Sequence, residues 1–200
     1  NSIKNIGDMV EYLNFNSDGF KSLGNNLNTG FDINEITTKF KYKTSKKAKI
    51  KQNVELKLHS YDEISNETYL GLTETDFEKN PFLRYPASEK DKMDAEHIQY
   101  LLTHELNFSE RFKITSNYYY NGFKRNWYKL DDVVFGDNSQ KISKVISNPE
   151  EFDSHISILK GGLDSNNSLK VKANNREYVS KGIQTKIDYH WYGKNNSFND

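Results

Sequence analysis

The sequence predicts an all-β fold, in the form of an antiparallel transmembrane β-barrel segment with about six strands. Three observations point to this class. Polar and apolar residues alternate with period two in several stretches of the chain. Some of these stretches run for ten residues or more, close to the roughly 9–11 residues that a tilted strand needs to cross a bilayer. Short polar turns and long loops alternate between them, which is the connectivity of outer-membrane barrels.

Three strands are predicted in the N-terminal part, at residues 8–15, 36–43 and 49–59. Their apolar sides collect Met9, Leu13 and Phe15, then Ile36, Phe40 and Tyr42, then Ile50, Gln52, Val54, Leu56 and Leu58. The opposite sides of the second and third strands are dominated by lysine. Such alternation is typical of strands with one apolar and one wet face.

Three further strands are predicted at residues 97–108, 112–121 and 182–191. Their apolar sides collect Ile98, Tyr100, Leu102, Leu106 and Phe108, then Phe112, Ile114, Tyr118 and Tyr120, then Ile183, Ile187, Tyr189 and Trp191. His104 interrupts the apolar side of the first of them. No amphipathic helical pattern competes with the strands.

The connections divide into two kinds. Short turns are expected at 44–49, 109–111 and 193–196, and long loops at 16–30, 60–95 and 128–177. Aromatic residues gather near the short-turn ends (Phe40, Tyr42, Phe108, Phe112, Tyr189, Trp191) and toward a long-loop end (Tyr118 to Tyr120, Phe123, Trp127). Two aromatic belts are typical of membrane-spanning strands. The pattern therefore predicts periplasmic short turns and extracellular long loops.

Composition excludes several function classes. Lys plus Arg and Asp plus Glu both number 28, so no overall field attracts nucleic acid. There is no cysteine, and no nucleotide-binding or nucleophile-elbow motif is present. The five histidines show no spacing that is typical of metal ligands. We therefore expect neither an enzyme nor a resident cofactor or metal. The chain opens at Asn1 without Met, and six strands cannot close a membrane barrel, so a piece of a longer protein is expected.

One long motif carries a family resemblance. The run SNETYLGLTETDFEKNPFLRYPASEKDKMD at 65–94 resembles a loop of TonB-dependent outer-membrane receptors of the ferric dicitrate type. That family's loop has the form D-E-x-S-N-E-T-Y-L-G-L-T-x-x-D-F, followed by N/D-P, R-Y and D-x-M. The flanking pieces at 17–20, 29–35, 123–130 and 180–191 are also similar to barrel strands and loops of the family, so the resemblance covers about residues 8–192.

The resemblance implies that residues 1–200 belong to the barrel domain of a receptor in the bacterial outer membrane. Such receptors take up a ferric chelate, such as ferric citrate or another siderophore-like ligand, through a twenty-two-stranded barrel. A plug domain closes this barrel, and the TonB complex supplies energy; neither the plug nor a TonB box is recognisable here. The implied partners are the ferric chelate, the TonB complex and outer-membrane lipid. The chain would form barrel wall and two ligand-capturing extracellular loops, at 65–94 and 129–177.

An anionic chelate needs cationic and hydrogen-bonding groups at the outer face. The candidate ligand-binding residues are Arg84, Tyr85, Lys90, Lys92, Lys124, Arg125 and Trp127. Each of them could equally be a solvated charge or a packing contact within a loop.

Two alternatives stay open. The chain could be a soluble β-sandwich module that binds glycans through its Trp and Tyr side chains, in which case the apolar faces would pack against one another. It could also belong to a barrel of another substrate class, one that takes up other metal chelates or oligosaccharides.

Overall fold

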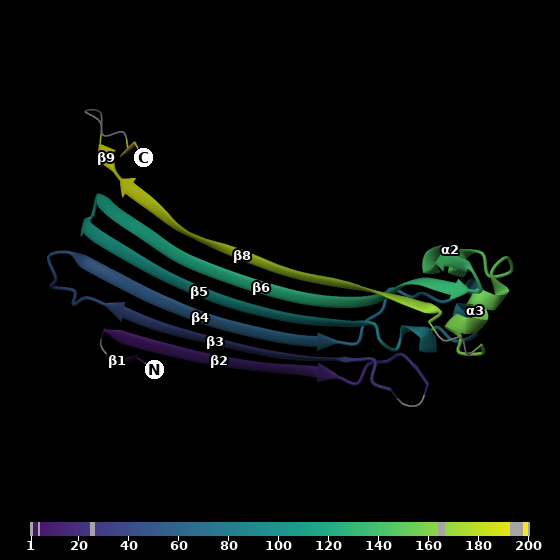
Figure 1. Cartoon of the computed structure of the whole chain (residues 1–200). Helices are drawn as coiled ribbons and strands as arrows, with labels where there is room; N and C mark the ends of the chain where they lie inside the picture. The colour runs from purple at the N-terminus through teal and green to yellow at the C-terminus, as the bar shows by residue number, and fades with distance from the viewer. Residues whose placement is uncertain (1, 4, 25–26, 164–166, 193–197, 200) are drawn as a thin grey trace.

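A single long, curved antiparallel sheet, carrying a small helical cap at one end, makes up most of the structure (Figure 1). The computed structural model describes residues 2–3, 5–24, 27–163, 167–192 and 198–199. The predicted antiparallel all-β class is confirmed. We use the term cap for residues 66–91, 136–163 and 167–168, which lie together at the end of the sheet.

Strands that follow one another in the chain also pair with one another. The sheet contains β1 (Ser2–Ile3), β2 (Ile6–Ser17), β3 (Phe31–Lys43), β4 (Lys51–Ser65), β5 (Lys92–Ser109), β6 (Phe112–Phe135), β7 (Asn138–Lys141) and β8 (Leu169–Tyr189). The order is β1 to β7, and β8 pairs with β6. A separate pair is formed by β9 (Trp191–Tyr192) and β10 (Phe198–Asn199). Within the described part of the chain, β8 and most of β2 leave the sheet with open edges.

The six predicted strands correspond to β2, β3, β4, β5, β6 and β8, and every one reaches further toward the cap than predicted. β6 is 24 residues long and β8 is 21. The sequence misses these extensions because both faces become polar there and the alternation fades. The turns at 44–50 and 110–111 are short, as expected. The turn predicted at 193–196 lies outside the described residues.

One side of the sheet, the apolar face, is covered with hydrophobic residues. The register places on this face Val10, Tyr12, Ile36, Phe40, Tyr42, Val54, Leu56, Leu58, Ile98, Tyr100, Leu102, Leu106, Ile114, Tyr118, Tyr120, Val179, Ile183 and Ile187. Many of them are exposed, including Val10 at 65% and Ile183 at 67%. Exceptions include Asp8 and Lys181 on the edge strands, and His104, whose Nε2 lies 3.0 Å from Gln52 Oε1. No second layer covers this face among the described residues.

For the first strand, the prediction of which residues lie on the apolar face is wrong. In β2 the even positions share the apolar face, because Val10 and Tyr12 lie opposite Thr38 and Ile36 of β3. Met9, Leu13 and Phe15 therefore lie on the opposite side of the sheet. The sequence misleads here because apolar residues occur at both odd and even positions of this strand.

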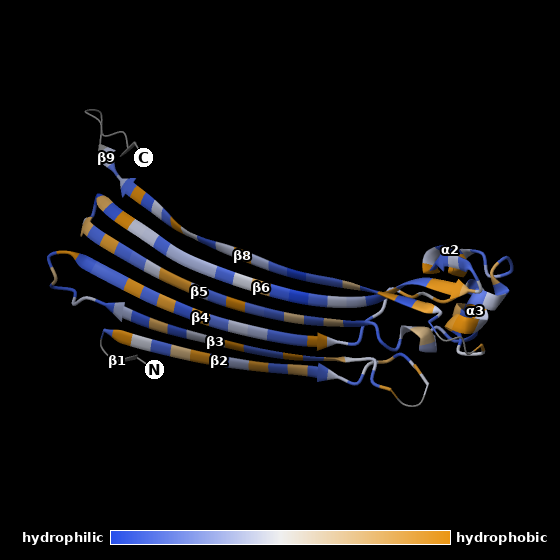
Figure 2. Cartoon of the chain, viewed as in Figure 1, coloured by the Kyte–Doolittle hydropathy of each residue, from blue (hydrophilic) through white to orange (hydrophobic). Residues whose placement is uncertain are grey.

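The opposite side of the sheet, the polar face, carries polar contacts between neighbouring strands, behind the residues of the apolar face. Thr103 donates to Asn117 (2.8 Å), Gln99 donates to Asn121 (2.8 Å), and Lys41 pairs with Glu55 (3.0 Å). Such cross-strand pairs stabilise a sheet. In Figure 2 the strands show the resulting alternation of hydrophilic and hydrophobic bands.

Aromatic side chains form a row at the short-turn end of the apolar face. Phe108 stacks on Phe112 (5.1 Å between ring centroids), Phe112 meets Tyr189 (6.3 Å), and Tyr189 stacks on Trp191 (6.2 Å). A second group on the same face includes Tyr100 and Tyr120, whose ring centroids lie 5.8 Å apart. Three members expected in this second belt, Tyr119, Phe123 and Trp127, lie instead on the polar face, because odd positions of β6 point that way.

The buried hydrophobic cluster lies in the cap and where it meets β6, not under the rest of the sheet. Its members are Leu70, Tyr85, Ala87, Leu130, Val133, Val145, Phe152, Ile156, Ile158 and Leu159. Three short helices contribute to the cap: α1 (Glu74–Lys79), α2 (Ile142–Ser147) and α3 (Asp153–Leu159), with the 3-10 turn η1 (Pro86–Ser88). The sequence predicted no helices here, since elements this short show no clear periodicity. No helix in the described part of the chain is long and apolar enough to cross a membrane.

Candidate functional site

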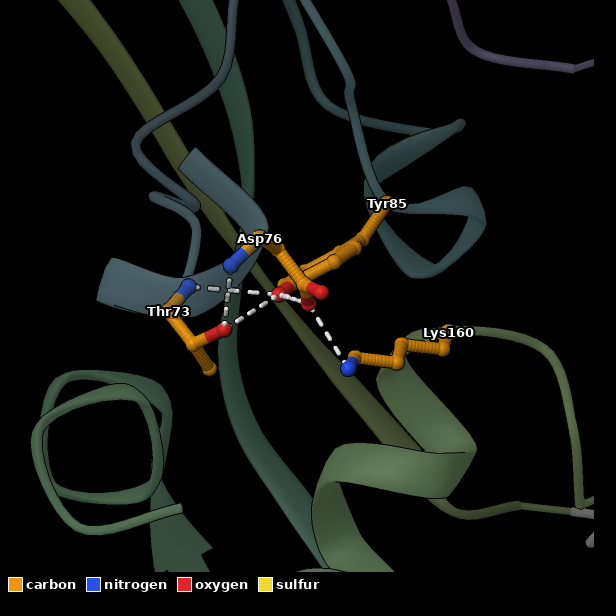
Figure 3. Close-up of polar contacts among 4 residues, drawn as sticks. All are labelled: Thr73, Asp76, Tyr85 and Lys160. Carbon is orange, nitrogen blue, oxygen red and sulfur yellow. Dashed lines mark hydrogen bonds and ion pairs between the residues drawn. The ribbon is translucent and has the colours of Figure 1, made fainter. Parts of the chain in front are cut away.

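The cap is fastened by four polar side chains from its two segments (Figure 3). Thr73 caps α1 by accepting a hydrogen bond from the Asp76 amide (3.3 Å). The Tyr85 hydroxyl donates to Asp76 Oδ2 (2.5 Å), and Lys160 Nζ pairs with the same oxygen at 2.7 Å. Residues far apart in the sequence, 73–85 and 160, are thereby joined into one unit.

The electrostatics of this junction follow from its partners. Burial opposes ionisation of Asp76, but hydrogen bonds from Lys160, Tyr85 and Thr73 hold the pKa of its carboxyl below the usual value. The hydrogen bond to Asp76 correspondingly raises the pKa of Lys160. Burial, together with the neighbouring Asp76, raises the pKa of Tyr85. The junction is therefore a neutral hydroxyl bonded to a charged pair.

Arg84 and Tyr85, two of the predicted ligand-binding residues, lie inside the cap, at 4% and 2% exposure. The Arg84 guanidinium donates to Ser88 Oγ (2.9 Å), to the Ser88 carbonyl (2.7 Å) and to the Asn66 carbonyl. Its donors are thus directed at atoms of the loop itself, two of them backbone carbonyls. The structure gives this pair the role of holding residues 66–91 in shape rather than of facing a ligand.

Asp91 connects the cap to the sheet. It is buried, and its Oδ1 accepts from the Leu130 amide (2.6 Å) while its Oδ2 accepts from Thr68 Oγ1 (2.5 Å). Leu130 lies beyond the point where β5 stops pairing with β6, so the carboxylate takes the place of the missing strand. Burial raises the pKa of Asp91 in spite of these donors.

The remaining predicted residues fall on different surfaces. Lys90 is exposed on the cap. Lys92 is directly opposite Tyr128, and Lys124 is directly opposite Glu96 and Glu177, which places both lysines on the side of the apolar face, above its hydrophobic residues. Arg125 and Trp127 lie on the polar face. The structure therefore separates Lys124 from its sequence neighbours Arg125 and Trp127.

Arg125 and Trp127 belong to a larger group on the polar face, which we call the basic–aromatic cluster. It consists of Arg125, Trp127 and Lys129 on β6, Lys172 and Arg176 on β8, and Tyr69 from the cap. The ring centroids of Tyr69 and Trp127 are 4.7 Å apart. Lys129 Nζ lies 4.8 Å from the Tyr69 ring centroid, and the Arg125 guanidinium carbon lies 5.3 Å from that of Trp127. Cation–π contacts of this kind stabilise the group.

Among the described residues, the two guanidinium groups of this cluster have no ion-pair partner, whereas Lys129 and Lys172 lie near the carboxylate of Asp131. Arg125 is directly opposite Arg176, and Lys129 is directly opposite Lys172, although like charges in such positions repel. Arg125 Nε is buried without a hydrogen-bond partner. Arg176 Nε donates to Asn174 (2.8 Å), and its Nη1 lies 3.5 Å from the Tyr178 hydroxyl on the same strand. Among the described residues, no carboxylate forms an ion pair with either guanidinium.

Four cations and two aromatic rings on a wet surface can bind an anion. Guanidinium groups form strong, geometrically defined hydrogen bonds with carboxylates. The sequence analysis found Arg125 and Trp127 but missed Tyr69, Lys129, Lys172 and Arg176. Lys129 could have been found from the sequence, because residues 123–129 place aromatic and basic side chains at alternate positions. Arg176 could not be found in this way, because it lies outside the strand predicted at 182–191. In the described part of the chain, no three His, Asp or Glu side chains group closely enough to hold a metal.

Comparisons with known proteins identify no relative. No family model matches the chain, and neither the curated proteins nor the solved structures contain a significant match.

Proposed function

We propose that this chain is a wall segment of a transmembrane β-barrel in a bacterial outer-membrane receptor that captures an anionic ferric chelate, of the TonB-dependent type. The observation that carries the proposal is the single-layer sheet with one exposed apolar face and one polar face. Barrel strands alternate in this way because lipid contacts one side and the aqueous interior the other.

The dimensions of the apolar face support this proposal. Ile98 and Phe108 on β5 are separated by about 33 Å of strand at about 3.3 Å per residue. With a strand tilt of about 40°, the height is about 25 Å, the height of the apolar band on outer-membrane barrels. The aromatic row at Phe108, Phe112 and Tyr189 lies at the short-turn boundary of this band, where an interfacial belt is expected.

The position of the basic–aromatic cluster supports an anionic ligand. The cluster lies on the polar face beside the cap, so in the proposed barrel it faces the outer vestibule. A ferric chelate with carboxylate ligands would meet Arg125, Arg176 and Lys129 there. Tyr69 of the cap contacts Trp127 within this cluster, and transport itself would require the plug and the TonB complex.

The soluble β-sandwich alternative predicts a different environment for the apolar face. A sandwich buries that face beneath a second sheet packed about 10 Å away. Among the described residues the face has no such cover, with Val10, Ile183 and Ile187 all more than half exposed. We therefore place the glycan-binding module second.

A binding measurement tests the chelate assignment. Protein carrying this chain, reconstituted in lipid bilayers, is incubated with radiolabelled iron as anionic ferric citrate or as a neutral ferric trihydroxamate. We expect saturable binding of ferric citrate that weakens as salt is added, because screening reduces charge attraction. Equal binding of both chelates, or binding that does not respond to salt, would contradict the anionic assignment.

A further inference from the structure

A groove on the cap lies between α1 and the end of α2, outside the basic–aromatic cluster. It has a volume of about 890 Å³ and is lined by Leu72, Glu74, Thr75, Phe77 and residues 146–151. This falls in the range of about 300–1,000 Å³ that is typical of ligand pockets. The groove is formed by two segments that the Asp76–Lys160 pair and the shared hydrophobic cluster hold together.

The floor of the groove is apolar. Leu72 and Ile146 pack against the buried cluster of the cap, and each is partly buried. Asp76, the preceding residue, faces Tyr85 in the interior of the cap. Phe77 points in a different direction from the same helix and is 55% exposed. A large aromatic side chain is thus held at the surface beside two aliphatic ones.

The rim of the groove is acidic. Glu74, Glu150 and Glu151 line it and are exposed, and no Lys or Arg is among the residues that line it. The whole chain has a net charge of zero, so this local excess of negative charge is not a property of the protein at large. It defines the charge of a complementary partner.

We propose that this groove binds a basic polypeptide segment that carries a large apolar side chain. The apolar side chain contacts Phe77, Leu72 and Ile146, while flanking lysines or arginines pair with Glu74, Glu150 and Glu151. An apolar anchor surrounded by a polar rim is the usual arrangement of a protein-binding surface. This surface is distinct from the chelate site, whose charge is opposite.

Fluorescence anisotropy with defined peptides tests this inference. The probe is a fluorescein-labelled peptide with one tryptophan flanked on both sides by lysines. The comparison peptides replace either the lysines by glutamates or the tryptophan by alanine. With the protein in bilayer discs, we expect the lysine–tryptophan peptide to bind most tightly, with an affinity that falls as salt is added.

Variants locate the binding. We expect Glu74→Gln/Glu150→Gln/Glu151→Gln to weaken binding about tenfold, since exposed ion pairs each contribute a small amount. Phe77→Ala should also weaken it, and because Phe77 is exposed this change leaves the cap folded, as circular dichroism can verify. The matched control Glu11→Gln/Glu89→Gln/Glu110→Gln removes the same charge from exposed sites elsewhere and should bind as the unmodified protein does. The inference is overturned if the groove variant binds like this control, or if the glutamate or alanine peptide binds as tightly as the probe.

Discussion

Arg125 on β6 lies directly opposite Arg176 on β8, on the polar face, and Arg125 Nε is buried without a hydrogen-bond partner. Two guanidinium groups in this arrangement repel each other unless an anion lies between or beside them. This relationship is the strongest indication of what the polar face binds, because the chain itself supplies no compensating carboxylate there among the described residues.

Removing one of these charges should separate binding from stability. We expect Arg176→Gln to weaken ferric citrate binding by about tenfold or more, since hydrogen bonds to charged groups contribute about 1.5–3 kcal/mol. The same change should leave the thermal stability equal or slightly higher, because it relieves the repulsion with Arg125. Lys47→Gln, in the exposed short turn at the other end of the sheet, is the control. Loss of binding in both variants alike would assign the effect to overall charge and not to the cluster.

Tyr85 offers two changes that test the interior of the cap. Tyr85→Phe removes the hydroxyl that bonds Asp76 and should cost about 1 kcal/mol of local stability. Tyr85→Ala also empties a buried volume and should cost about 3–5 kcal/mol. Hydrogen exchange of residues 66–91 measures both effects, and exchange in β4 and β5 should stay unchanged. If Tyr85→Ala leaves the exchange of the cap unaltered but abolishes chelate binding, then Tyr85 contacts ligand and the structural role is wrong.

The Asp76–Lys160 pair should make the cap sensitive to pH at both extremes. The folded pKa of Asp76 is lowered, so its contribution is present above the unfolded value of about 4 and is lost as pH falls through the folded pKa. The folded pKa of Lys160 is raised, so its contribution is present below about 10.5 and is lost as pH rises further. The exposure of Lys160 limits the pair to about 0.5–1 kcal/mol.

Limited proteolysis of the cap between pH 3 and 7 can measure the acidic arm of this dependence. We expect faster cleavage at the acidic end in the unmodified protein. Lys160→Met should cleave faster at neutral pH and show a smaller acid effect, since Asp76 loses its charged partner. An acid response of the same size in Lys160→Met would show that another group controls the cap.

Substitutions at two neighbouring residues on β8 test whether the apolar face contacts lipid and the polar face contacts water. Ile183 is 67% exposed on the apolar face, and Gln184 is exposed on the polar face. In the proposed barrel, Ile183→Arg should reduce the free energy of folding into bilayers by about 2–4 kcal/mol, whereas Gln184→Arg should have little effect. Denaturant titration in lipid vesicles measures both. A soluble sheet with both side chains in water would tolerate the two substitutions equally.

The strands of this fold could be predicted from sequence because each has alternating faces over most of its length. Their cap-side ends could not, since Asp62, Glu63, Lys124 and Arg125 make both faces polar. Arg176 was missed for the same reason: the stretch 169–181 has little alternation, although it pairs with β6 throughout.

The interior of the cap was beyond sequence reasoning for a different physical reason. Arg84 and Tyr85 have the side chains that an anion site needs, yet their partners are Ser88, Asp76 and, indirectly, Lys160. The contacts with Ser88 and Asp76 depend on how residues 66–91 fold back on themselves, and the contact of Lys160 with Asp76 depends on how two separate segments pack. The helices α1 to α3 are likewise too short for their periodicity to be recognised.

The central claim, that the apolar face contacts lipid, is tested most directly by spin-label accessibility at Leu102 and Thr103. The chain has no cysteine, so Leu102→Cys and Thr103→Cys each introduce one label position into this segment, on the apolar and polar face respectively. In the protein reconstituted into bilayers, we expect the label at 102 to be accessible to oxygen and shielded from a water-soluble nickel complex, and the label at 103 to show the reverse. If both labels contact the nickel complex equally, or if both are shielded from oxygen as in a sandwich interior, the sheet does not form a barrel wall.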